Sequence, residues 1–105
     1  MKYLWLDDER PIPKYFHNGE AASASTYNDA IDTFLNINTD TEHICISFDN
    51  DLGEDKTGYD FAKWLVEHGV TGYFHIHSMN PVGVFNIRQL LEHYDWTEVF
   101  YNIRT

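Results

Sequence analysis

The chain has 105 residues, of which 43% are hydrophobic, so we expect a single domain over residues 1–105 with one core. Seventeen acidic against seven basic side chains give a formal net charge of −10, which disfavours broad binding to nucleic acid or to anionic membranes. No apolar run reaches the length of a membrane span or a signal-peptide core, so a cytoplasmic location is expected. The lone cysteine, Cys45, is expected to be a buried structural thiol.

The first expected strand, Tyr3–Leu6, is apolar on both faces, as strands buried in a parallel sheet usually are. It ends in the polar run Asp7–Arg10, after which Pro11 and Pro13 exclude a long regular helix. A short strand is predicted at Ala21–Ser25, although small residues have little strand propensity.

A capping-box pattern that begins at Thr26 predicts a helix from about Tyr27 to Asn36. The most apolar strand candidate, His43–Phe48, follows and is expected to be central in the sheet. Asp49 and Asp51 come directly after it, so this strand delivers two carboxylates to its carboxyl end.

Strands and helices continue to alternate in the second half of the chain. A second capping box predicts a helix over Thr57–Gly69, and Tyr73–Ser78 is expected to be a strand. Asparagine followed by proline predicts a helix over Asn80–His93, and Val99–Ile103 is expected to be the last strand. The alternation favours an α/β fold, a small doubly wound parallel sheet that is covered on both faces.

Right-handed crossovers place the carboxyl ends of parallel strands at one edge of the sheet. That edge should gather polar side chains from three strands: Asp7, Asp8, Asp49, Asp51, His77, Ser78 and Asn80. Carboxylates that lie this close repel each other, and a hard divalent cation relieves the repulsion. We therefore expect Mg²⁺ or Mn²⁺, whereas no zinc-ligand spacing or glycine-rich phosphate motif is present in the sequence.

Several side chains at this edge have both a functional and a structural interpretation. Arg10 could grip a phosphate in a bidentate manner or neutralise Asp8 in a salt bridge. His77 could act as a general acid or base, whereas His75, on the same strand face, is more often a packed residue.

The two polar residues that follow the histidines have ordinary structural roles as well. Ser78 could hold a phosphate oxygen or be a turn residue. Asn80 could cap the helix, and the same helix N-terminus offers backbone N–H groups to an anion.

Five segments together resemble one known family, the cyclic-phosphate processing receiver-like domains. They are Leu6–Pro11, Ser47–Gly53, Thr57–Asp60, His77–Gly83 and Asn86–Ile87. The resemblance implies a receiver-like, flavodoxin-type fold with a divalent metal at the strand ends. It also implies a role in processing cyclic phosphates of nucleotides or RNA ends.

The wider resemblance is to response-regulator receivers. It implies that Asp7, Asp8 and Asp49 bind Mg²⁺, that Asp49 accepts a phosphoryl group, and that Ser78 fills the hydroxyl position after the fourth strand. The sequence departs from that pattern because it shows neither the lysine expected after the last strand nor a fifth helix. His77 is also foreign to ordinary receivers and favours phosphoester chemistry.

Three functional hypotheses follow. The first is a metal-dependent phosphoesterase that acts on a small nucleotide or an RNA-end phosphate. Its expected residues are Asp7, Asp8, Asp49 and Asp51 for the metal, Arg10, Ser78 and Asn80 for the substrate, and His77 to protonate the leaving oxygen. The second is a signalling receiver that is phosphorylated on Asp49, so the sequence leaves open whether Asp49 is a ligand or a nucleophile. The third is a non-catalytic protein that binds a cyclic nucleotide or mimics an anion.

Overall fold

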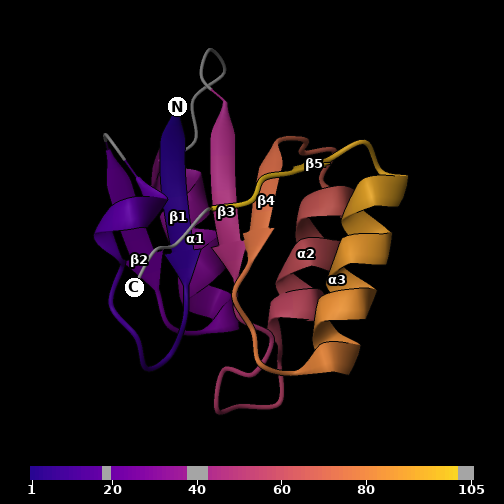
Figure 1. Ribbon diagram of the computed structural model, residues 1–105, viewed down its shortest axis with the longest axis horizontal. Coiled ribbons are helices and arrows are strands. Elements are labelled where there is room, and N and C mark those ends of the chain that lie inside the picture. Colours follow the sequence, from indigo (N-terminus) through magenta and orange to yellow (C-terminus); the bar gives the residue numbers. More distant parts are fainter. Residues whose placement is uncertain (18–19, 38–42, 102–105) are drawn as a thin grey trace.

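The computed structural model describes residues 1–17, 20–37 and 43–101. These residues form a five-stranded sheet of order β2-β1-β3-β4-β5 in which every pairing is parallel (Figure 1). The strands are β1 (Lys2–Leu6), β2 (Ala21–Ala24), β3 (Ile44–Phe48), β4 (Tyr73–Ile76) and β5 (Thr97–Glu98). The predicted parallel α/β fold is therefore confirmed. The short strand predicted at Ala21–Ser25 is present as β2, because its pairing with β1 outweighs its low strand propensity.

The helices are α1 (Tyr27–Ile37), α2 (Gly58–Glu67) and α3 (Pro81–His93), and Lys14–Phe16 form a short 3₁₀ turn, η1. The caps predicted for α2 and α3 are present. Thr57 and Asp60 form a reciprocal capping box on α2, and the Asn80 side chain accepts two backbone N–H groups at the start of α3. None of the described helices has the length and apolarity needed to cross a membrane.

The main core lies between the sheet and the helices. Alternate strand residues such as Leu4, Ile46 and Phe74 point to this side and are fully buried. All three described helices contribute to the same cluster, with Phe34 from α1 and Leu91 from α3 as examples. The three helices therefore share one face of the sheet.

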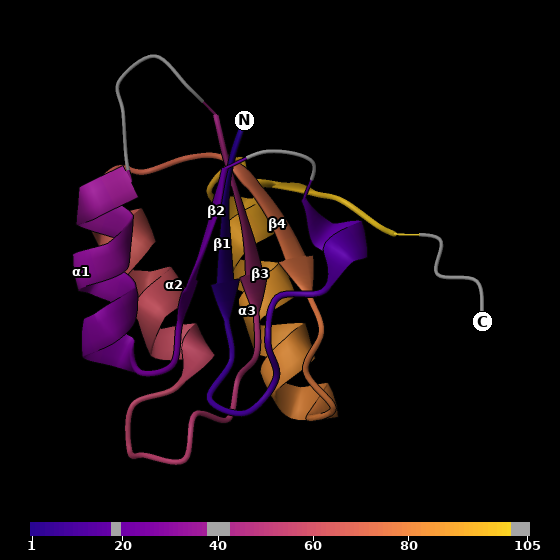
Figure 2. The ribbon, with the colours of Figure 1, turned by 90° about the vertical axis from the view of Figure 1, so that its left-hand side faces the viewer.

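The second face of the sheet is covered by a small aromatic cluster. Trp5 and Cys45 lie on this face, and Phe16 of η1 and Tyr101 of the C-terminal segment pack over them. Figure 2 shows η1 and this segment on the opposite side of the sheet from α1 and α2. Cys45 is buried as expected, and burial raises the pKa of its thiol to about 11. A 3₁₀ turn and extended chain thus take the place of the helices expected on this face.

The last strand differs from the prediction. It was expected at Val99–Ile103, but β5 comprises Thr97–Glu98, and residues 102 and 103 lie outside the described ranges. The backbone N–H of Val99 still bonds the carbonyl of Phe74 at 2.7 Å. The chain then leaves the sheet edge, and the half-buried ring of Tyr101 packs over the face that no described helix covers. As predicted, no helix follows β5 in the described part of the chain.

Candidate metal and phosphate site

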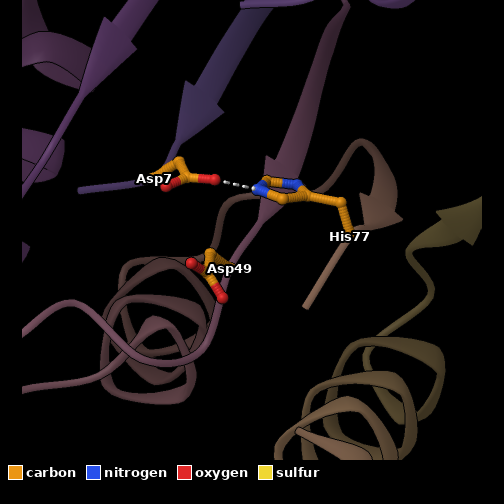
Figure 3. Close-up of side chains that lie close together, drawn as sticks. All are labelled: Asp7, Asp49 and His77. Carbon is orange, nitrogen blue, oxygen red and sulfur yellow. Dashed lines mark hydrogen bonds and ion pairs between the residues drawn. The ribbon is translucent and has the colours of Figure 1, made fainter. Parts of the chain in front are cut away.

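Three side chains meet where the central strands end. The last residues of β1, β3 and β4 are paired with one another in register, so the next row of the sheet edge brings in Asp7, Asp49 and His77. His77 extends from beyond β4 toward Asp7, and Asp49 lies beside them (Figure 3). One possible ligand atom from each residue lies within 4.8 Å of the others. The predicted convergence of strand ends is confirmed for these three residues.

Asp7 is the most heavily bonded of the acids, and only 6% of the residue is exposed. Its Oδ1 accepts the backbone N–H groups of Glu9 at 2.8 Å and Arg10 at 2.9 Å. Its Oδ2 lies 2.9 Å from Nε of Arg10 and 3.1 Å from Nε2 of His77. Burial would raise the pKa of Asp7, but these backbone bonds and the guanidinium charge hold it below its usual value. Asp7 is therefore a carboxylate at neutral pH.

In contrast to Asp7, Asp49 has a pKa above its usual value, although both residues lie in the same site. Burial raises its pKa, and the negative charge of Asp7 raises it further. Arg10 and a hydrogen bond from Ser78 act in the other direction but do not compensate. Two buried carboxylates thus lie close together with too little positive charge around them, which is the condition that a bound cation relieves.

Arg10 pairs with Asp7 and not with Asp8, which was the partner considered from the sequence. In addition to the bond through Nε, its Nη2 lies 3.4 Å from the carbonyl oxygen of His77. Its own carbonyl accepts Nε1–H of Trp5 at 3.0 Å. The side chain is 52% exposed, so the guanidinium is held in place at one end and open to solvent at the other.

A cavity of about 420 Å³ opens next to these residues. Its walls are mostly acidic, with Arg10, Gly53 and Met79 as exceptions; the lining residues are Asp7, Asp8, Glu9, Arg10, Asp49, Asp51, Gly53 and Met79. This volume is in the range of small-molecule sites in proteins. All four predicted metal-binding acids and one predicted phosphate-binding residue therefore face one cavity.

Ser78 and Asn80 have local bonding roles at the edge of the site. Ser78 hydrogen-bonds Asp49, and its hydroxyl also accepts the backbone N–H of Asn80 at 3.1 Å. The Oδ1 of Asn80 accepts two N–H groups of the first turn of α3, and its Nδ2 lies 3.4 Å from Asp51. The helix N-terminus thus has two of its N–H groups occupied by its own cap.

His77 is held from three directions. Its Nε2 faces Asp7, its Nδ1 lies 2.7 Å from Oγ of Ser47, and its ring stacks on Trp5 at a centroid distance of 3.8 Å. The side chain is 6% exposed. Burial lowers the pKa of His77 to about 4, although the Asp7 charge opposes the shift. The imidazole is therefore neutral at pH 7.

The roles of Ser47 and Trp5 were missed in the sequence interpretation. Trp5, Ser47 and His75 lie opposite one another in the register of β1, β3 and β4, on the second face of the sheet. Ser47 Oγ lies 2.7 Å from Nδ1 of His75 as well as from that of His77. A serine inside an apolar strand, with two histidines at alternate positions of another strand, was the available signal.

Asn50 and two glycines allow the loop between β3 and α2 to lie close to the site. The carbonyl of Asn50 accepts N–H of Gly58 at 2.8 Å, which brings the helix start close to the end of β3. A Cβ on Gly58 would lie 2.0 Å from the carbonyl oxygen of Asp49. Gly53 has φ +69°, and a Cβ there would lie 3.0 Å from a carboxylate oxygen of Asp8. The role of Asn50 was not predicted from the sequence.

Comparison with known protein families identifies the family of this chain. The cyclic-phosphate processing receiver domain matches residues 2–93 of the chain. The chain belongs to this family. The match runs from β1 to the end of α3 and so includes the acids, Arg10 and both histidines of the site. No curated protein and no solved structure matches the chain. The resemblance noted from the sequence is thereby confirmed.

Proposed function

We propose that this cyclic-phosphate processing receiver domain is a metal-dependent phosphoesterase that opens cyclic phosphates of nucleotides or RNA ends. The observation that carries the proposal is the cluster of Asp7, Asp49 and His77, which offers three ligand atoms within 4.8 Å of one another. Both acids of the cluster line an acidic cavity. The family assignment supports the substrate class.

The donor set fits a divalent cation. Two carboxylates suit Mg²⁺ or Mn²⁺, and an imidazole nitrogen favours Mn²⁺, because Mg²⁺ takes oxygen ligands almost entirely. Burial and the charge of Asp7 raise the pKa of Asp49, which is consistent with a site that lacks a cation beside this carboxyl group. Asp8 and Asp51 line the same cavity and could supply further oxygens. When bound, the ion would polarise phosphoryl oxygens and lower the pKa of a water that attacks phosphorus.

The chain's own groups would then bind and orient the phosphate. The half-exposed guanidinium of Arg10 at the cavity wall is the group we assign to the phosphate oxygens. Ser78 fixes the carboxyl group of Asp49 through its hydroxyl. A neutral imidazole is a poor proton donor, so we assign His77 to the metal through Nε2 in place of the proton-donor role expected from the sequence.

The test is a hydrolysis assay on 2′,3′-cyclic and 3′,5′-cyclic nucleotides, with Mg²⁺, with Mn²⁺ and with chelator. Wild-type protein should open at least one of them to a phosphate monoester with an added ion, and His77→Ala should lose this activity. The matched control is Glu67→Gln, an exposed acid at the far end of α2, which should behave as wild type. If no substrate is opened with either ion above the level of His77→Ala, the proposal fails.

A signalling receiver is the second candidate, favoured by the hydrogen bond between Ser78 and Asp49 at the end of β3. In that case small phosphodonors should leave a base-labile phosphoryl group on Asp49. Recovery of unchanged cyclic nucleotide from a tight complex would instead indicate a binding protein without catalysis.

A further inference from the structure

A chain of hydrogen bonds connects the acidic site to the second face of the sheet. It runs from Asp7 to Nε2 of His77, from Nδ1 of His77 to Oγ of Ser47, and from Ser47 to Nδ1 of His75. Ser47 is fully buried in the central strand, and the stack of His77 on Trp5 prevents the ring from turning freely. Each link therefore has a fixed geometry.

The direction of every bond in this chain follows from Asp7. Asp7 is a carboxylate that accepts from Glu9 and Arg10, so Nε2 of His77 must carry the proton that lies between them. A neutral imidazole then has a bare Nδ1, and the single hydroxyl proton of Ser47 must point to it. Because that proton is used, Ser47 accepts from His75, whose proton is on Nδ1. The two histidines consequently have opposite tautomers.

We propose that Ser47 and His75 are positioning residues that set the tautomer of His77, and that a cation bound by Asp7, Asp49 and His77 reverses the tautomers of both rings. The second half of this inference rests on the proposed function, whereas the first half concerns the protein without an ion.

The reversal follows from the same bond counting. A nitrogen that binds a cation must be bare, so Nε2 of His77 loses its proton and Nδ1 gains one. The hydroxyl proton of Ser47 passes to Nδ1 of His77, and the Nδ1 proton of His75 passes to the Ser47 oxygen. Nδ1–H of His77 then donates to Ser47, Ser47 donates to the bare Nδ1 of His75, and His75 takes up a proton from solvent on Nε2. One proton leaves at His77 and one is taken up at His75. The line of hydrogen bonds thus gains no net proton, and only the tautomers of the two rings change.

An Asp–His–Ser line also occurs in serine hydrolases, but Ser47 does not have that role here. Its hydroxyl is fully buried inside the sheet, so a substrate in the cavity does not reach it. Its contact is with the imidazole nitrogen that points away from the acids. Ser47 therefore acts through His77 and not on the substrate.

The test uses ¹⁵N NMR of histidine-labelled protein at neutral pH, with signals assigned from His75→Gln and His77→Gln. Without an ion, wild-type His75 should be protonated on Nδ1 and His77 on Nε2. Saturation with Zn²⁺, a diamagnetic probe that accepts imidazole, should reverse both. The same tautomer in both rings of the ion-free protein would overturn the inference, and this measurement does not depend on turnover.

Two serine variants separate positioning from general damage. In Ser47→Ala the ion should still change His77 but leave His75 unchanged, and ion affinity should fall by about 10-fold to 100-fold, as for other residues that support a metal ligand. Ser23→Ala is the matched control, because Ser23 is an exposed serine in the same row of β2 and should behave as wild type. If the ion still reverses the tautomer of His75 in Ser47→Ala, the proposed coupling of the two rings through Ser47 is wrong. Opposite tautomers in an inactive protein would instead contradict only the proposed function.

Discussion

Replacing Asp49 with asparagine should stabilise the protein in the absence of divalent ions. The carboxylate of Asp49 is buried beside that of Asp7, and both burial and this neighbour raise its pKa. A buried acid with a raised pKa destabilises the fold as pH rises through that pKa, because the unfolded chain loses its proton more easily. Asparagine has nearly the same shape without the charge, so this penalty disappears.

The size of the effect can be worked out from the separation of the two carboxyl groups. Their ligand atoms lie within 4.8 Å, and at an effective dielectric constant of about 20 the repulsion is about 3.5 kcal/mol. The substitution also removes the attraction of Arg10 and the charge on the Ser78 hydrogen bond, about 1 kcal/mol each. We therefore expect a net stabilisation of about 1–2 kcal/mol, and each kcal/mol should raise the Tm by about 4–8 °C in a domain of this size.

Urea unfolding and thermal melts in chelator provide the assay. The stability difference between Asp49→Asn and wild type should be small near pH 4 and grow as pH rises toward 7. Added Mn²⁺ should raise the Tm of wild type and leave that of the variant unchanged. An ion-free variant that is less stable than wild type at pH 7 would refute the electrostatic reasoning.

Three other predictions concern the supports of the site. Tyr101→Phe loses the hydroxyl that donates to the carbonyl of Phe16 at 3.1 Å, so urea unfolding should show a free energy of unfolding lower by about 1 kcal/mol. An unchanged free energy of unfolding would mean that this hydrogen bond does not anchor the C-terminal segment over the second face. Gly58→Ala places a Cβ 2.0 Å from the backbone of Asp49 and should cost at least about 1–3 kcal/mol with weaker ion binding, as measured by calorimetry; unchanged ion affinity would contradict the close approach. Burial lowers the pKa of His77 to about 4, so ion-free wild type should lose up to about 3 kcal/mol of stability as pH falls from 6.5 to 4. His77→Gln should lose much of that dependence, and an unchanged pH profile would refute it.

Much of the site could be predicted from sequence because its parts are local. Asparagine and proline at the start of α3, and threonine three residues before Asp60, specify their helices without reference to the rest of the fold. The acids that end β1 and β3 converge because parallel strands share one carboxyl edge. These features depend on spacing, which a sequence displays directly.

The parts that were missed depend on pairing between distant strands. The shared hydroxyl of Ser47 needs the register of β3 against β4, and the pairing of Arg10 with Asp7 needs the geometry of the turn after β1. The last strand was expected at Val99–Ile103 and lies instead at Thr97–Glu98, because strand propensity does not reveal that no described helix covers one face of the sheet. On that face the half-buried Tyr101 packs beside Phe16.

We propose that Asp7, Asp49 and His77 hold an ion that opens a cyclic phosphate. The most direct measurement is ³¹P NMR of a 2′,3′-cyclic nucleotide incubated with Mg²⁺ and wild-type protein, repeated by chromatography with Mn²⁺. Wild type and Glu67→Gln should convert it to a phosphate monoester, whereas Asp49→Asn should not, even though that variant is folded. A cyclic phosphate that persists with both ions, or turnover by Asp49→Asn equal to wild type, would contradict it.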